Sequence, residues 1–192
     1  MRGSSARDNY VMYCIKRKSR AAKSGSFKLL SLANAGRWAA NARRRDQRVV
    51  ATNGCFDLLH FGHVSYLQRA KQLGDVLVVG LNSDASVRQL KGPSRPLVDG
   101  KHRAAVLAAL ECVDAVVIFP EKRAHRFLAT VQPDVYAKGG DYRPDTLDPR
   151  ERAVLTAIGA TVRILPFVRG FSTTKLIERI RRAARKHDAR SR

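Results

Sequence analysis

The sequence predicts an α/β protein in which five parallel strands form one sheet with helices on both faces. From Arg48 onward, short runs rich in β-branched residues alternate with stretches of helical spacing, the pattern of parallel strands joined by crossover helices. Most strand candidates are continuous apolar runs, as expected for strands covered on both faces. A chain of 192 residues, 44% of them hydrophobic, is long enough to enclose one core of this kind.

The elements are predicted from these runs and from helix-compatible spacing between them. The segment from Lys91 to Pro96 interrupts the alternation, because two prolines, a glycine and two cations favour a loop. Strands are predicted at Arg48–Asn53, Asp75–Asn82, Asp114–Phe119, Asp134–Lys138 and Thr161–Leu165. Helices are predicted at His63–Leu73, Lys101–Leu110, Ala124–Thr130, Pro149–Ile158 and Thr173–Lys186, the last of them basic and amphipathic.

Ligands of a parallel α/β sheet bind beyond the carboxyl ends of its strands, near the point where the strand order reverses. The chemistry is therefore expected in the turns that follow the strands. Four of these turns are rich in Gly, Ser, Thr, Asp, Lys or His: Asn53–His63, Asn82–Asp84, Lys138–Tyr142 and Gly170–Lys175.

The net charge of +21 is concentrated at the two ends of the chain. Residues 1–48 hold 13 Lys and Arg against two acidic residues, and residues 179–192 hold seven against one. We therefore expect a basic, flexible N-terminal extension (1–47), a folded domain (48–180) and a basic C-terminal tail (181–192). Solvated tails account for the excess, and the alternative is a nucleic-acid-binding module that grips phosphates through these tails.

Several protein classes are disfavoured by what the sequence lacks. Cys14, Cys55 and Cys112 are far apart and form no Cys-x-x-Cys pair, which argues against a disulfide framework or zinc cluster and favours a cytoplasmic protein. No apolar run approaches the length of a membrane span, and neither a P-loop nor a Gly-x-Gly-x-x-Gly fingerprint occurs. Charged residues interrupt the N-terminal segment, which therefore lacks the continuous apolar core of a secretory signal. Its Arg/Ser/Ala-rich composition fits an organelle transit peptide or a later start at Met12 equally well.

The turn after the first predicted strand carries the clearest signal for chemistry. It places His60 and His63 on either side of Gly62, at the start of the first long helix. The N–H groups and dipole of that helix favour an anion, the glycine lets a ligand approach the backbone, and the imidazoles add hydrogen-bond donors. The same spacing also permits metal ligation or a structural histidine pair, although no Cys or third His occupies a neighbouring predicted turn.

The pattern His60-x-Gly62-His63, preceded by Asn53-Gly54-x-Phe56-Asp57, resembles the signature of the cytidylyltransferase-like nucleotidyltransferases. The resemblance implies an enzyme with a Rossmann-like fold of the HxGH nucleotidyltransferase type, using a nucleoside triphosphate. It covers roughly residues 48–180 and continues through Leu73-Gly74-Asp75, Asn82-Ser83-Asp84, Arg103, Val113-Asp114 and Ser172-Thr173-Thr174-Lys175.

Within that family, three segments are similar to the heptose 1-phosphate adenylyltransferases, which often form one half of a bifunctional enzyme with a sugar kinase. The segments are Leu90 to Pro96, Lys138 to Tyr142 and Gly170 to Lys175. The similarity implies transfer of AMP from ATP to D-glycero-β-D-manno-heptose 1-phosphate, giving ADP-heptose and pyrophosphate for lipopolysaccharide or surface-glycan synthesis. The alternative on this scaffold is a cytidylyltransferase for glycerol 3-phosphate or a related phosphoalcohol, because the residues do not reveal which base binds.

The resemblance also implies roles for individual residues. His60 and His63 are expected to donate hydrogen bonds to the α- and β-phosphates, and Lys91 and Arg103 to contact phosphates, with Arg95 a weaker candidate. Mg²⁺ is expected to accompany ATP without a protein metal site, Asp57 to orient the turn, and the chain to form a homodimer. The implied nucleotide-binding residues are Asn53, Gly54, Cys55, Phe56, Asp57, Gly62, Ser172, Thr173 and Thr174, and the implied acceptor-binding residues are Lys138, Gly140 and Asp141.

Overall fold

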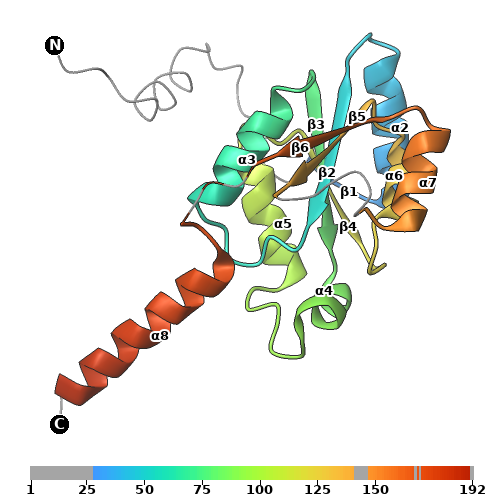
Figure 1. Ribbon diagram of the computed structural model, residues 1–192. Coiled ribbons are helices and arrows are strands. Elements are labelled where there is room, and N and C mark those ends of the chain that lie inside the picture. The colour runs from blue at the N-terminus through green and yellow to red at the C-terminus, as the bar shows by residue number, and fades with distance from the viewer. Residues whose placement is uncertain (1–27, 141–146, 167, 169, 191–192) are drawn as a thin grey trace, which may run out of the picture.

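The structure, a computed structural model, describes residues 28–140, 147–166, 168 and 170–190, the last five by their backbone alone. Six parallel strands form one sheet in the order β1-β4-β3-β2-β5-β6, with helices on both faces (Figure 1). No helix in these described segments is long and apolar enough to cross a membrane. The elements are β1 (Leu29–Leu30), α2 (Leu32–Arg43), β2 (Val49–Gly54), α3 (Phe61–Lys71), β3 (Val76–Asn82), α4 (Asp84–Lys91), α5 (Gly100–Ala109), β4 (Ala115–Phe119), α6 (His125–Val131), β5 (Val135–Gly139), α7 (Pro149–Ala157), β6 (Thr161–Leu165) and α8 (Thr173–Arg190).

The predicted α/β class is confirmed, with six strands instead of five. All five predicted strands are present, with ends displaced by at most one residue. Aspartates set where strands begin: Asp75 and Asp134 each accept a hydrogen bond, at 2.7 Å, from one of the two N–H groups at the start of β2. Asp114 does the same for the second N–H of β3. These carboxylates satisfy donors at the amino edge of the sheet, opposite the edge where ligands are expected.

Alternating side chains of the central strands form two cores, one on each face of the sheet. In β3, Val76 and Val78 belong to the core covered by α2, α6 and α7, whereas Leu77, Val79 and Leu81 belong to the core covered by α3 and α5 (Figure 1). Because both faces are buried, the strand reads as a continuous apolar run rather than an alternating one. The rigid sheet fixes the positions of the turns at its carboxyl edge.

Residues 29–43, expected to lie in a flexible extension, are part of the folded domain, so the predicted domain start at residue 48 is too late. β1 pairs with β4 at the edge of the sheet, and α2 packs on the first core through Ala35, Ala39 and Ala42, all 0% exposed. The small alanines allow close packing against the sheet and contribute little apolar bulk. The apolar stripe of this alanine-rich helix is therefore weak.

Two further boundaries differ from the prediction. Residues 84–91 form the unpredicted helix α4, which Ser83 caps by accepting a hydrogen bond from the Ser86 N–H at 3.2 Å. Lys91 is thus the last helical residue and not part of the loop. Helix α8 runs without a break across the expected boundary at residue 180 and projects away from the domain (Figure 1).

Candidate active site

The carboxyl ends of β2 and β5 meet at the point where the strand order reverses. These strands are neighbours, although β3 and β4 come between them in the chain and lie on the far side of β2. The connections therefore diverge above β2 and β5 and leave a place for a ligand there. Asn53 and Lys138 lie at this position, where the Lys138 Nζ donates a hydrogen bond to the Asn53 Oδ1 at 3.0 Å.

His60 and His63 stack ring on ring, with centroids 3.8 Å apart and planes inclined by 19°. Gly62 makes this possible, since a Cβ at that position would lie 3.1 Å from the His60 ring and 3.0 Å from the Cβ of Phe171. Phe56 meets His63 edge-on at 5.3 Å and holds a left-handed φ of 41°, which non-glycine residues rarely adopt. The His-x-Gly-His spacing thus produces a paired imidazole surface on the first turn of α3.

Both imidazoles are neutral near pH 7. The pKa of His63 is lowered to about 4, chiefly by burial and to a smaller extent by the nearby His60, while a hydrogen bond with the Leu58 backbone opposes the shift. Burial also lowers the pKa of His60. The Nδ1 atoms of both rings are buried and have no well-formed hydrogen bond to any described residue. A neutral imidazole still carries one N–H, so the pair is suited to donating hydrogen bonds rather than supplying positive charge.

Two helix N-termini converge on the histidines. His60 is the N-cap of α3 and its side chain makes no capping bond. The His63 N–H donates to the His60 carbonyl at 2.9 Å, and the N–H groups of Phe61 and Gly62 precede this first intrahelical bond. At the start of α8, the Ser172 Oγ accepts a hydrogen bond from the Lys175 N–H at 3.1 Å, so Ser172 caps that helix. The Phe171 ring lies 6.4 Å from the His60 ring and 5.2 Å from the Phe61 ring. Ser172, Thr173 and Thr174 are therefore brought beside the histidine pair.

Asp57 connects the turn after β2 to the loop after α4. Its buried carboxylate accepts hydrogen bonds from the N–H groups of Leu97, at 2.8 Å, and Val98, at 3.0 Å, and pairs with Arg95 at 2.7 Å. Asp57 therefore has the contacts of a side chain that orients the turn. Its ion pair also engages Arg95, the weaker candidate for contacting phosphate.

Lys91 is exposed at the end of α4. Burial raises the pKa of the Cys55 thiol, and the charge of Lys91 opposes this shift.

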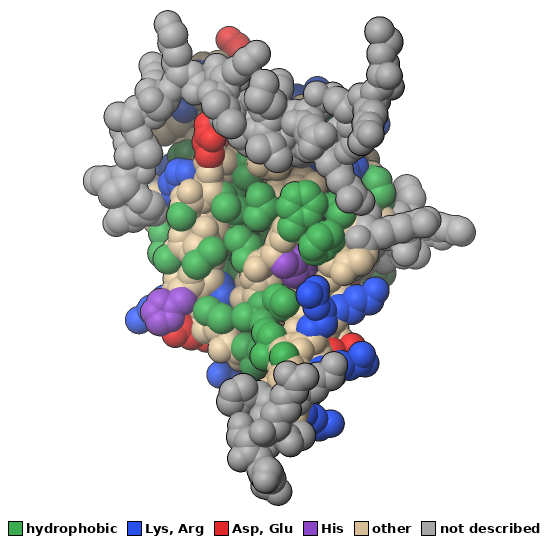
Figure 2. Space-filling view, turned by 90° about the vertical axis from the view of Figure 1, so that its left-hand side faces the viewer, with side chains coloured by type: hydrophobic (Ala, Val, Ile, Leu, Met, Phe, Trp, Pro, Cys, Tyr) green, Lys and Arg blue, Asp and Glu red, His purple; other side chains and the backbone are tan. Residues whose placement is uncertain are grey.

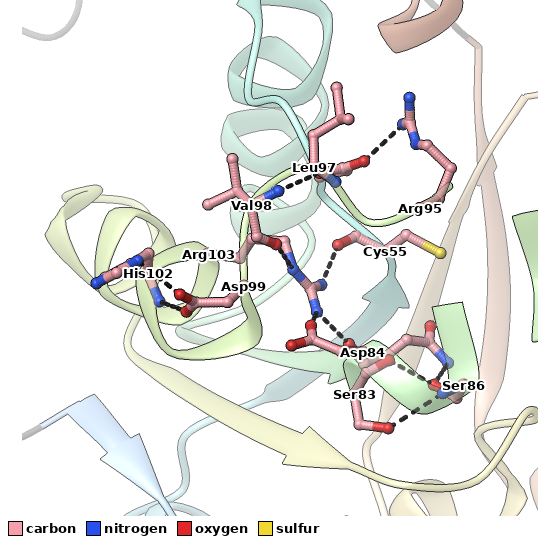
Figure 3. A network of polar contacts seen from close by, with 12 residues as sticks. Cys55, Ser83, Asp84, Ser86, Arg95, Leu97, Val98, Asp99, His102 and Arg103 are labelled. Carbon is pink, nitrogen blue, oxygen red and sulfur yellow. Dashed lines mark hydrogen bonds and ion pairs between the residues drawn. The ribbon is translucent and has the colours of Figure 1, made fainter. Parts of the chain in front are cut away.

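Arg103 was expected to contact phosphate, but the structure gives it another role. Its side chain is 0% exposed and donates to the carbonyls of Val98, at 2.9 Å, and Asn82, at 2.9 Å, to the Cys55 carbonyl, and to the Asp84 carboxylate at 2.7 Å (Figure 3). A guanidinium this fully engaged holds the turns after β2 and β3 together. These contacts give Arg103 a positioning role in this structure, and its contact with phosphate stays a prediction.

The acceptor candidates lie at the end of β5. Lys138 is largely buried, and burial lowers the pKa of its ammonium group. Gly140 has a φ of 110°, and its N–H donates to the Leu165 carbonyl at 2.9 Å, whereas Asp141 lies outside the described residues. Sequence reasoning missed Tyr136 and Glu151, which surround Lys138. A tyrosine two residues before Lys138, on the same face of a buried strand, was the available signal.

A Rossmann-like sheet with a stacked histidine pair between two helix N-termini defines a nucleotidyltransferase of the HxGH type. Residues 51–179 match the family described as Cytidylyltransferase-like, and the chain belongs to it. The predicted family and enzyme class are thereby confirmed.

Similar proteins support this placement. The chain is 56% identical over 139 residues to the "Bifunctional protein HldE" of Geotalea uraniireducens and 54% identical over 138 residues to that of Syntrophotalea carbinolica. Each match covers 72% of this chain but 28% of the relative, so the chain spans less than a third of those proteins. A crystal structure of the lipopolysaccharide core biosynthesis protein from Thermoplasma volcanium is 32% identical, with a TM-score of 0.52 over 64% of this chain and 97% of that one.

Proposed function

We propose that this protein transfers AMP from ATP to D-glycero-β-D-manno-heptose 1-phosphate, forming ADP-heptose and pyrophosphate. The observation that carries the reaction type is the neutral, stacked pair of His60 and His63 beside the N-termini of α3 and α8, an arrangement of donors suited to phosphate oxygens. The choice of substrates is supported by the similarity to HldE and to the lipopolysaccharide core biosynthesis protein. The relatives do not favour a glycerol 3-phosphate cytidylyltransferase or a nucleic-acid-binding module.

In the proposed reaction, an oxygen of the sugar phosphate attacks the α-phosphorus of ATP in line with the leaving group. A new P–O bond forms while the bond to the oxygen that bridges the α- and β-phosphates breaks, and pyrophosphate leaves with that electron pair. The attacking group is already an anion near neutral pH, so catalysis depends on positioning and on donors directed at the developing charge. His60 and His63 supply such donors, Lys91 supplies a cation for the triphosphate, and Lys138 receives the acceptor phosphate.

Other residues hold these groups in place. Asp57 and Arg103 fix the turns after β2 and β3, and Gly62 admits the His60 ring. For the nucleotide we propose contacts from Asn53, Gly54, Cys55, Phe56, Gly62, Ser172, Thr173 and Thr174, and for the sugar phosphate contacts from Lys138, Gly140 and Asp141.

A divalent cation is used with ATP by nucleotidyltransferases of this kind, and we propose Mg²⁺. The described residues contain no group of three His, Cys, Asp or Glu side chains able to hold a metal ion, and Asp57 and Asp84 are engaged with arginines. We therefore propose that the cation arrives bound to the triphosphate, whose charge it screens.

The test is pyrophosphate release measured for ATP and CTP against heptose 1-phosphate and glycerol 3-phosphate. Turnover is expected with ATP and heptose 1-phosphate, and His63→Ala should slow it by about 10²-fold through loss of a transition-state donor. His102→Ala is the matched control, because that histidine is 76% exposed and pairs with Asp99. Unchanged turnover in folded His63→Ala would refute the site, and turnover with CTP alone would reassign the protein.

We further propose a cytoplasmic homodimer, the compartment being where ATP is available. Phe61, Val106, Phe171 and Ile180 are large, exposed hydrophobic residues. The Phe61 and Phe171 rings lie 5.2 Å apart, and Val106 and Ile180 line one pocket. Apolar side chains gather around a histidine on the face drawn in Figure 2. Contiguous apolar surface of this kind marks association sites. Light scattering on the purified chain should give twice its mass of 21.3 kDa, and a monomer at micromolar concentration would refute the dimer.

A further inference from the structure

A buried polar network lies beneath the edge where β2 and β5 end. The Glu151 side chain, from the first turn of α7, has one carboxylate oxygen 3.6 Å from the Lys138 Nζ and 3.4 Å from the Tyr136 hydroxyl. The Tyr136 hydroxyl also donates to the Asn53 Oδ1, the atom that accepts from Lys138. The network thus connects α7 to both strands of the candidate site.

The second oxygen of Glu151 fixes the orientation of this carboxylate. It accepts a hydrogen bond from the Ala124 N–H, at 2.8 Å, just before α6. Glu151 is 3% exposed, and a buried carboxylate is stable only when paired and hydrogen-bonded. Its position in the first turn of α7, capped by Asp148, adds a favourable helix dipole. The carboxylate is therefore held rigidly with one oxygen presented to Lys138.

We propose that Glu151 is a positioning residue that keeps the Lys138 ammonium charged and directed at the carboxyl edge of β2 and β5, where the acceptor phosphate binds. The proposal rests on the proposed function and extends it to a residue that touches neither substrate. The Lys138 side chain is 12% exposed, so water alone does not support its charge.

The charges around Lys138 set the expected pH dependence. Burial lowers the pKa of Lys138, and Glu151 is the largest opposing influence. Among the described residues, Arg123, before α6, lowers this pKa, and Asp148, the cap of α7, raises it. The Tyr136 ring, 5.1 Å from the ammonium, and the Asn53 amide on β2 also face Lys138. Removing the charge of Glu151 must therefore make Lys138 lose its proton at lower pH.

The decisive variant is Glu151→Gln, which keeps an oxygen for the Ala124 N–H, removes the charge, and places an amide NH2 where the carboxylate oxygen faced Lys138. We expect the KM for the sugar phosphate to rise about tenfold, with the KM for ATP changed less than twofold, since a charge-assisted contact is lost on the acceptor side alone. In the pH profile of kcat/KM for the sugar phosphate, the fall on the alkaline side should move to lower pH. Glu151→Asp, which retains the charge, should restore the position of that fall, and Glu111→Gln, at an exposed position, should leave every parameter unchanged.

A direct titration separates this proposal from the proposed function. The lysines are ¹³C-methylated, the Lys138 resonance is assigned by its absence from Lys138→Arg, and its titration is followed by NMR in wild type and Glu151→Gln. A titration at lower pH in the variant supports the proposal, and an unchanged titration overturns it. If the wild type uses no sugar phosphate, the proposed function fails while the NMR result still decides the role of Glu151.

Discussion

The free energy of unfolding should fall markedly between pH 7 and pH 5 because of His63. The pKa of this residue drops from 6.5 to about 4 on folding, chiefly through burial. A group with a lower pKa in the folded state binds more protons when unfolded, so its contribution is complete above pH 6.5 and is lost as the pH falls toward 4. The difference corresponds to about 2 kcal/mol less stability at pH 5 than at pH 7, and to about 3 kcal/mol below pH 4.

The assay is urea unfolding followed by the fluorescence of Trp38, the single tryptophan, which packs against the first core. Wild type is compared with His63→Gln, which cannot titrate, and with the exposed control His102→Gln. Other groups also titrate in this range, so the informative quantity is the difference between wild type and variant. Wild type should lose about 2 kcal/mol more than His63→Gln. Equal losses would show that the imidazole is not held neutral in its stacked position.

Three further predictions concern packing in the site and in the core. Gly62→Ala should destabilise the fold by about 1–3 kcal/mol in urea and reduce turnover, because the new Cβ displaces the His60 ring or Phe171, and wild-type values for both would contradict this packing. Ala39→Asp should lower the free energy of unfolding by about 3 kcal/mol or more by burying an unpaired carboxylate, whereas a solvated extension would tolerate it. Arg103→Met should cost about 3–5 kcal/mol by leaving its buried acceptors unpaired, and a merely phosphate-binding arginine would instead affect KM at unchanged stability.

The strands and most helices could be predicted because their signals are local. Continuous apolar runs specify buried strands, and the five helices expected from spacing begin and end within four residues of their predicted ends. Helix α2 escaped prediction because its buried face consists of Ala35, Ala39 and Ala42, which differ little from a polar surface in apolar bulk. Helix α4 escaped because its eight residues are mostly polar and precede a loop with two prolines.

Much of the candidate site also follows from the sequence. The His60-x-Gly62-His63 spacing places two imidazoles on one helical turn whatever surrounds it. The contacts of Arg103 could not be predicted from the sequence, because arginine commonly binds phosphate. Only the structure shows that its donors are engaged by the turns after β2 and β3.

The sequence by itself determined the α/β class, the family and the histidine pair, since each depends on residues close together in the chain. The tertiary structure alone decided which polar groups meet at the carboxyl edge of the sheet. Asn53 and Lys138 are 85 residues apart, and Glu151 approaches Lys138, on β5, from helix α7. Side chains so distant in sequence are brought together by the crossing order of the strands and by burial, which local patterns do not encode.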